Sequence, residues 1–129
     1  MESGYAVVMQ DCRGRHDSDG EWEPYIHEAT DGYDTHEWIG AQPWCDGKLG
    51  MMGISWGGFN ALQVAARRPP ALKAIITVCS TDDRYADDIH YKGGALLCEN
   101  LGWASTMLSY SSRPPDPALV AEDWREIWR

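Results

Sequence analysis

The sequence is poor in basic residues and long apolar runs, and each shortage excludes a class of protein. Lys and Arg number 11 against 20 Asp and Glu, which gives a net charge of −9. Such a chain has no basic patch for nucleic acid or an anionic membrane. Its apolar runs are far shorter than the roughly 20 residues of a membrane-spanning helix, and its N-terminus lacks the features of a signal peptide. We therefore expect a cytoplasmic protein with no nucleic-acid and no membrane partner.

The sequence also lacks closely spaced cysteines. The four cysteines are Cys12, Cys45, Cys79 and Cys98. Their wide separation favours free thiols in a reducing compartment. The histidines and acidic residues do not have the spacing of a metal site either, so we expect no metal ion and no other cofactor.

What the sequence does contain is an alternation of apolar runs and helical patterns, which predicts an α/β fold. The expected strands cover residues 5–10, 49–54 and 72–79. The expected helices cover about 31–42, 59–67, 94–110 and 118–128, the first with Thr30 or Asp31 as its N-cap. Right-handed crossovers would make consecutive strands parallel. We predict a parallel sheet with helices on both faces over residues 1–80, followed by a helical region over 81–129.

One motif points to chemistry. Gly53-Ile54-Ser55-Trp56-Gly57-Gly58 stands between the second expected strand and the helix after it. G-x-S-x-G in a strand–turn–helix context is typical of a nucleophile elbow, in which a strained turn exposes the serine hydroxyl. We predict that Ser55 is a nucleophile and that the backbone N–H of Trp56 stabilises the oxyanion. Gly57 and Gly58 are expected to be required by the backbone. The alternative is a glycine-rich turn with a chance serine.

Around this motif the chain resembles the X-Pro dipeptidyl-peptidase/cocaine esterase family of α/β-hydrolases. Four blocks, in the family's order, carry the resemblance: residues 4–11 with 13–14 and 18–21, residues 31–39 with 42–44, residues 47–58, and residues 72–75 with 82–97. The resemblance implies a partial α/β-hydrolase core over residues 1–80 and the start of a helical cap over 81–129. It also implies a serine hydrolase that forms an acyl-enzyme through Ser55, with Trp56 where relatives often carry tyrosine. A small ester, amide or X-Pro peptide remains open as the substrate.

The resemblance also indicates what is missing. The family's acid and general-base histidine follow the cap, and its first strands precede the region matched here, so the chain resembles an internal fragment. Its own histidines are expected to be surface or structural residues: His16, His27, His36 and His90. Asp11, Asp82 and Asp83 are expected to cap turns rather than to border a pocket. We expect an isolated fragment to be inactive and prone to self-association. The alternative is a non-catalytic remnant that needs a partner chain to fold.

Overall fold

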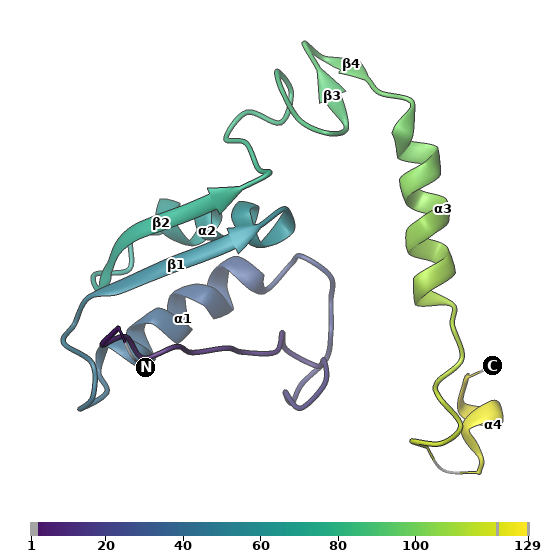
Figure 1. Cartoon of the computed structure of the whole chain (residues 1–129), viewed down its shortest axis with the longest axis horizontal. Coiled ribbons are helices and arrows are strands. Elements are labelled where there is room, and N and C mark those ends of the chain that lie inside the picture. Colours follow the sequence, from purple (N-terminus) through teal and green to yellow (C-terminus); the bar gives the residue numbers. More distant parts are fainter. Residues whose placement is uncertain (1–2, 121, 129) are drawn as a thin grey trace. The chain divides into compact units, whose positions relative to one another are not determined.

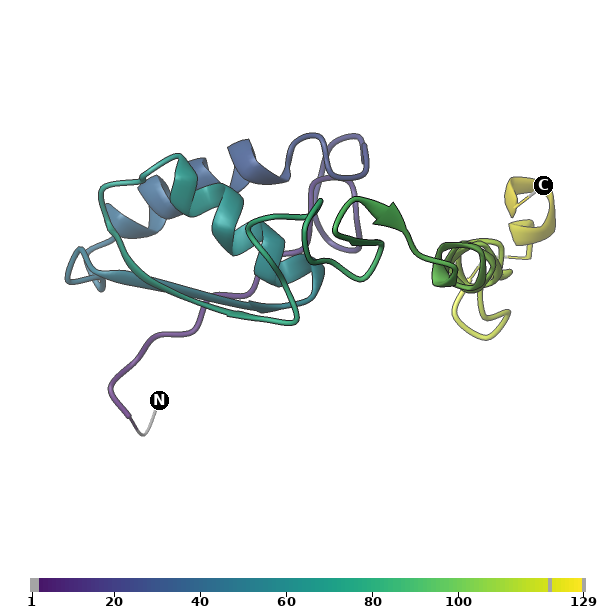
Figure 2. The ribbon, with the colours of Figure 1, turned by 90° about the horizontal axis from the view of Figure 1, so that it is seen from above.

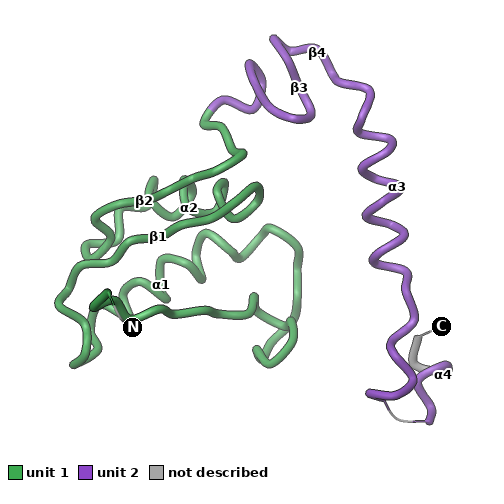
Figure 3. The backbone as a smooth tube through the Cα atoms, viewed as in Figure 1, with its two compact units in different colours: residues 1–82 green, residues 83–129 purple. Residues whose placement is uncertain are grey.

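The computed structural model describes residues 3–120 and 122–128, and the chain forms two compact units (Figure 3). The first unit is Met1–Asp82 and the second is Asp83–Arg129. Within the described residues, no helix has the length and apolar character needed to cross a membrane. All four cysteines are free, as predicted.

The first unit is built on a parallel pair of strands joined by a helix (Figure 1). β1 (Leu49–Ile54) pairs with β2 (Leu72–Val78), with Ile54 opposite Val78. Parallel neighbours need a crossover connection, which α2 (Trp56–Ala66) supplies. α2 packs against both strands, and α1 (Glu28–Gly40) packs against α2 (Figure 2). The predicted α/β fold with a parallel sheet and flanking helices is confirmed.

The core of this unit lies between the sheet and the helices. Ala61 and Val64 of α2 are completely buried, and Phe59 and Ile39 are 8% exposed. The strands alternate between half-buried and exposed residues. Large apolar side chains on the exposed positions are Met52, Ile54, Ile76 and Val78. One face of the sheet is therefore packed, while the other carries apolar side chains exposed to solvent.

The predicted strand at residues 5–10 is wrong. The segment has no regular secondary structure, and Val7 and Met9 are 79% and 92% exposed. An isolated extended segment leaves its backbone N–H and C=O groups without the ladder partners that define a strand. Among the described residues, nothing pairs with this segment as a sheet neighbour.

The start of α1 also differs from the prediction. The helix begins at Glu28, and its N-cap is His27, which makes no side-chain capping bond. Neither Thr30 nor Asp31 is the cap, because both lie inside the helix. The Asp31 carboxylate instead accepts two hydrogen bonds from the Arg13 guanidinium, at 2.9 and 2.5 Å.

Within its described residues, the second unit contains a short hairpin and two helices. β3 (Tyr91–Lys92) and β4 (Ala95–Leu96) are antiparallel, and Gly93 and Gly94 connect them with φ of 53° and 80°. These positive values are typical of hairpin turns. α3 (Glu99–Ser111) follows, so the predicted start of a helix at residue 94 is wrong.

The last predicted helix is much shorter than expected. α4 spans only Trp124–Trp128 rather than residues 118–128. The preceding residues turn instead, because the Asp116 carboxylate accepts from the Ala118 N–H at 2.9 Å and its carbonyl accepts from the Leu119 N–H at 2.9 Å. An aspartate that bonds its own following backbone favours a turn over a helix.

Candidate active site

Ser55 occupies the sharp turn between β1 and α2, in the strand–turn–helix arrangement that the sequence predicted. Its φ is 57° and its ψ is −121°, a conformation that a residue with a Cβ rarely adopts. The turn is held by hydrogen bonds on both sides. The Ser55 N–H donates to the Val78 carbonyl at 2.7 Å, while its carbonyl accepts from the N–H groups of Gly58 and Phe59 at 2.9 and 3.1 Å. Neighbouring strand and helix therefore fix the strained backbone from both directions.

The Ser55 hydroxyl is available for chemistry. The residue is exposed, and although it stands at the N-cap position of α2, its side chain makes no capping bond. The side-chain oxygen of a serine at that position usually accepts a hydrogen bond from a backbone N–H of the first helical turn. Here the backbone conformation turns the side chain away from that role.

Close approach of strand and helix requires glycine at two positions of the motif. A Cβ on Gly53 would lie 2.2 Å from the backbone carbonyl atoms of Gly57. A Cβ on Gly58 would lie 2.5 Å from Ser80 Oγ, so the prediction for Gly58 is confirmed. The prediction for Gly57 is wrong, because a Cβ there meets nothing within 4 Å. The close approach near Gly57 instead requires glycine at position 53.

Trp56 is the first residue of α2, and several neighbours hold its side chain. The N–H groups of a first helical turn point outward from the N-terminus, where they can face an anionic group. The Trp56 indole Nε1 donates to Glu28 Oε2 at 2.5 Å. The ring meets Tyr25 edge-on, with centroids 4.5 Å apart, and lies 5.8 Å from the ring of Phe59. The motif did not indicate Glu28, because a contact across 28 positions leaves no local pattern.

Two of the histidines have structural surroundings. His36 is buried in α1, and its Nδ1 lies 2.7 Å from the carbonyl oxygen of Gly32, one turn earlier. His27 Nε2 lies 3.3 Å from a carboxylate oxygen of Glu23. These contacts agree with the expected surface and structural roles.

The remaining histidines do not reach the elbow by any bond that the structure describes. His16 is exposed in a loop turn with φ of 49°, and His90 belongs to the second unit. Across residues 3–120 and 122–128, no histidine is hydrogen-bonded to the Ser55 hydroxyl. The described residues therefore place the Ser55 hydroxyl at a helix N-terminus, but they pair no histidine base with it.

The acidic residues that follow the expected strands have separate roles. Asp83 Oδ1 accepts from the N–H groups of Tyr85 and Ala86 at 3.1 and 3.0 Å, the turn-capping role expected for it. Asp11 and Asp82 are exposed. In the described part of the chain, no group of three or more histidine, cysteine or acidic side chains is arranged to hold a metal ion.

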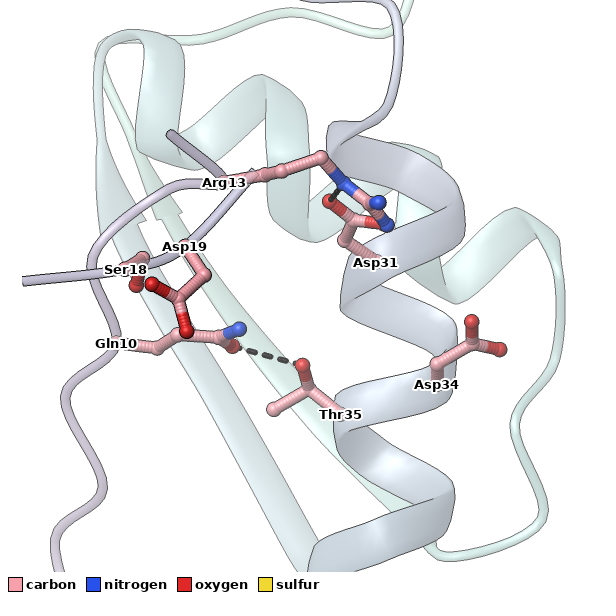
Figure 4. A pocket seen from close by; sticks show the side chains of 7 residues that line it. All are labelled: Gln10, Arg13, Ser18, Asp19, Asp31, Asp34 and Thr35. Carbon is pink, nitrogen blue, oxygen red and sulfur yellow. Dashed lines mark hydrogen bonds and ion pairs between the residues drawn. The ribbon is translucent and has the colours of Figure 1, made fainter. Parts of the chain in front are cut away.

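Two open cavities lie in the first unit, away from the elbow. One, of about 310 Å³, is lined by Gln10, Arg13, Ser18, Asp19, Asp31, Asp34 and Thr35 (Figure 4). The other, of about 550 Å³, is lined by Val8, Met9, Gln10, Asp11, Asp17, Ser18, Asp34, Thr35 and Trp38. Neither includes Ser55. We place the candidate site at the elbow because it combines an exposed nucleophilic atom with a helix N-terminus, whereas these cavities lie between a loop and α1.

The cavity in Figure 4 is organised by two contacts between the N-terminal segment and α1. Thr35 Oγ1 donates to Gln10 Oε1 at 2.7 Å. Arg13 and Asp31 form an ion pair, and the hydrogen bond from the guanidinium lowers the pKa of the Asp31 carboxyl despite its partial burial. The ion pair positions the loop against α1, and the Arg13 charge in this cavity is already paired with Asp31.

Comparison with known proteins places the chain in a family. Residues 1–129 match the family described as X-Pro dipeptidyl-peptidase (S15 family). A cocaine esterase from Rhodococcus sp. (strain MB1 Bresler) is 42% identical over 106 residues, which are 81% of this chain and 18% of that protein. Proteins of Mycobacterium bovis and Mycobacterium tuberculosis, named as candidate serine esterases, are 38% identical over 98 residues, 73% of this chain and 15% of each. The chain spans less than a fifth of the length of these relatives. It belongs to the X-Pro dipeptidyl-peptidase (S15) family.

Proposed function

We propose that this chain carries the nucleophilic serine of a hydrolase that cleaves ester or peptide-type bonds. The family and the names of the relatives support a hydrolase of this type. The observation that carries the assignment to Ser55 is its backbone: a non-glycine residue at φ 57°, exposed, at the start of α2, with no capping bond from its hydroxyl. Strain of this kind persists where the surrounding structure maintains it, and it gathers at active sites.

In the proposed reaction, Ser55 Oγ attacks the substrate carbonyl while a histidine base takes the hydroxyl proton. The carbonyl oxygen becomes an oxyanion, which accepts a hydrogen bond from the backbone N–H of Trp56 at the N-terminus of α2. Collapse of this intermediate expels the alcohol or amine, which takes the proton from the histidine. The acyl group remains on Ser55 until water removes it. No cofactor is needed for these steps.

The substrate class and the surroundings of the site belong to the same proposal. Residues 81–129 would correspond to the start of the family's helical cap, and the substrate would be a small ester, amide or X-Pro peptide. The four free thiols support a reducing, cytoplasmic location.

A second candidate is a remnant without catalytic activity that folds with a partner chain. The exposed sheet face favours it: Met52 and Ile54 are 71% and 66% exposed, and Ile76 is 59% exposed. A large contiguous apolar surface of this kind usually marks an interaction site. The partner would supply sheet or helix against this face.

The test compares Ser55→Ala with the unmodified sequence in the whole protein that carries it. We expect a fluorophosphonate probe to label the protein at Ser55, and the alanine variant to lose both labelling and turnover of p-nitrophenyl acetate by several orders of magnitude. Ser3→Ala is the matched control, because Ser3 is also exposed and has no part in the proposed site. Turnover within tenfold of the unmodified protein after Ser55→Ala would overturn the assignment of Ser55, whereas an unmodified protein with neither labelling nor turnover would favour the remnant.

A further inference from the structure

The start of α2 lacks the stabilisation that helix N-termini usually have. Its N-cap residue, Ser55, makes no side-chain capping bond, and no acidic residue of its own stands in its first turn. First turns fray readily when nothing outside the helix holds them. An elbow that keeps its serine hydroxyl for catalysis therefore needs another means of fixing this turn.

Glu28, the first residue of α1, provides such a means from the neighbouring helix. Its Oε2 atom accepts two hydrogen bonds, from Trp56 Nε1 at 2.5 Å and from Asn60 Nδ2 at 2.7 Å. Trp56 and Asn60 are four residues apart and so lie on one face of α2. A single carboxylate therefore bridges the first two turns of the helix and ties them to α1.

The hydrogen bonds of Glu28 are partly shielded from water, and Glu28 orients the Asn60 side chain. Glu28 is half-buried, so its hydrogen bonds are less exposed to competition from water than those of a surface pair. Among the described residues, Asn60 Oδ1 is buried without a hydrogen-bond partner, which leaves Glu28 as the partner that orients this side chain. The edge-on contact with Tyr25 holds the Trp56 ring from another side.

We infer that Glu28 is a positioning residue for the elbow. Through the indole of Trp56 and the amide of Asn60, it fixes the first turn of α2 and thereby the Trp56 N–H that faces the oxyanion. This inference rests on the proposed function and deepens it. Glu28 would mainly stabilise the transition state, where the backbone N–H of Trp56 must meet a developing charge. It would contribute much less to substrate binding. A misplacement of about 1 Å in such a group costs on the order of 10²-fold in rate.

The test measures kcat and KM for p-nitrophenyl acetate in the whole protein that carries this sequence. We expect Glu28→Ala to lower kcat about 10- to 100-fold while KM stays within about twofold. Glu28→Gln keeps a carbonyl oxygen that accepts from both donors, so it should retain kcat within about threefold. Glu37→Ala is the matched control, because Glu37 is an exposed glutamate on the same helix.

A second variant protects the test against loss of folding. Trp56→Phe keeps the backbone N–H and an aromatic ring against Tyr25 but cannot donate to Glu28. It should lower kcat with KM unchanged, as Glu28→Ala does. If Glu28→Ala does not fold, the Trp56→Phe and Glu28→Gln variants decide the question on their own.

The outcomes separate this inference from the proposed function. A fall in kcat without a rise in KM, restored by glutamine, supports the positioning role. Turnover that depends on Ser55 but is unchanged by Trp56→Phe or Glu28→Ala overturns the inference alone, as does a Glu28→Gln variant as impaired as the alanine variant. Turnover that survives Ser55→Ala overturns the proposed function, and the inference with it.

Discussion

β1 and the segment at residues 5–10 are both largely apolar runs of six residues, but their structures differ. The segment at 5–10 contains the β-branched pair Val7 and Val8. β1 is nevertheless a strand paired along its length with β2, whereas the N-terminal segment is irregular, unpaired within the described residues and exposed. β1 has its partner one helix away in the chain. The comparison teaches that an apolar pattern predicts a strand only where a neighbour supplies the ladder.

The largest expected effect concerns activity. Residues 1–129 expressed alone should hydrolyse p-nitrophenyl acetate about 10²- to 10⁴-fold more slowly than the whole protein that carries them. The reason is that the described residues pair no histidine with Ser55, and a serine without its base is almost wholly protonated at neutral pH. Initial rates with the Ser55→Ala variant as background measure this.

Residues 1–129 expressed alone also test whether the exposed apolar surfaces cause association. The exposed sheet face and the bare segment at 5–10 should drive self-association, which sedimentation velocity would detect as concentration-dependent oligomers. Saturable turnover that depends on Ser55 would contradict the expectation, and would show that His16, His27 or His90 completes the site.

The next largest effect is on stability, and it compares two glycines of the elbow, Gly53 and Gly57. Gly53→Ala should destabilise the protein by about 3 kcal/mol, because the new Cβ would overlap backbone atoms that cannot move independently. Gly57→Ala is its matched control. Its Cβ meets nothing within 4 Å, and alanine in a helix is favoured over glycine by about 0.5–1 kcal/mol. Urea unfolding of both variants gives the difference. Equal destabilisation by the two substitutions would contradict the close approach at Gly53.

A smaller effect on stability distinguishes a buried valine from an exposed one. Val64→Ala removes a completely buried side chain and should cost about 2 kcal/mol through lost burial and the cavity left behind. Val7→Ala makes the same change at a residue that is 79% exposed, and should change stability by less than about 0.5 kcal/mol. If Val7→Ala proved as costly as Val64→Ala, the segment at 5–10 would be packed in solution.

The parts of the fold that the sequence predicted are those with short-range causes. The limits of β1, the turn at Ser55 and the end of α2 before Pro69 all follow from an apolar run, a glycine-rich motif and a proline. Some errors involve partners outside the local pattern, whereas the starts of α3 and α4 depended on local turns at Gly93-Gly94 and Asp116. The strand expected at 5–10 has no sheet neighbour among the described residues. Glu28 was missed for the same reason, since only the folded chain brings it to Trp56.

The smallest effect concerns the ion pair that ties the loop after the unpaired segment to α1. Arg13 lowers the pKa of Asp31 from its usual value of 3.8. A carboxyl whose pKa is lower in the folded state stabilises the fold above its unfolded pKa, and this contribution is lost as the pH falls through the folded value. The Arg13 side chain is 51% exposed and that of Asp31 is 20% exposed, so solvent screens the pair and keeps the effect small.

Asp31→Asn should therefore lower the urea midpoint at pH 7 slightly, and the difference from the unmodified chain should shrink toward zero as the pH falls through the lowered pKa of Asp31. Arg13→Gln should behave in the same way, because either change removes the pair. Asp17→Asn is the control, since Asp17 is an exposed aspartate in the same loop. A difference at Asp31 that persisted undiminished at pH 2 would mean that packing rather than charge holds the loop. Increased proteolysis of the segment at 5–10 in both pair variants would tie this loop contact to the order of the unpaired segment.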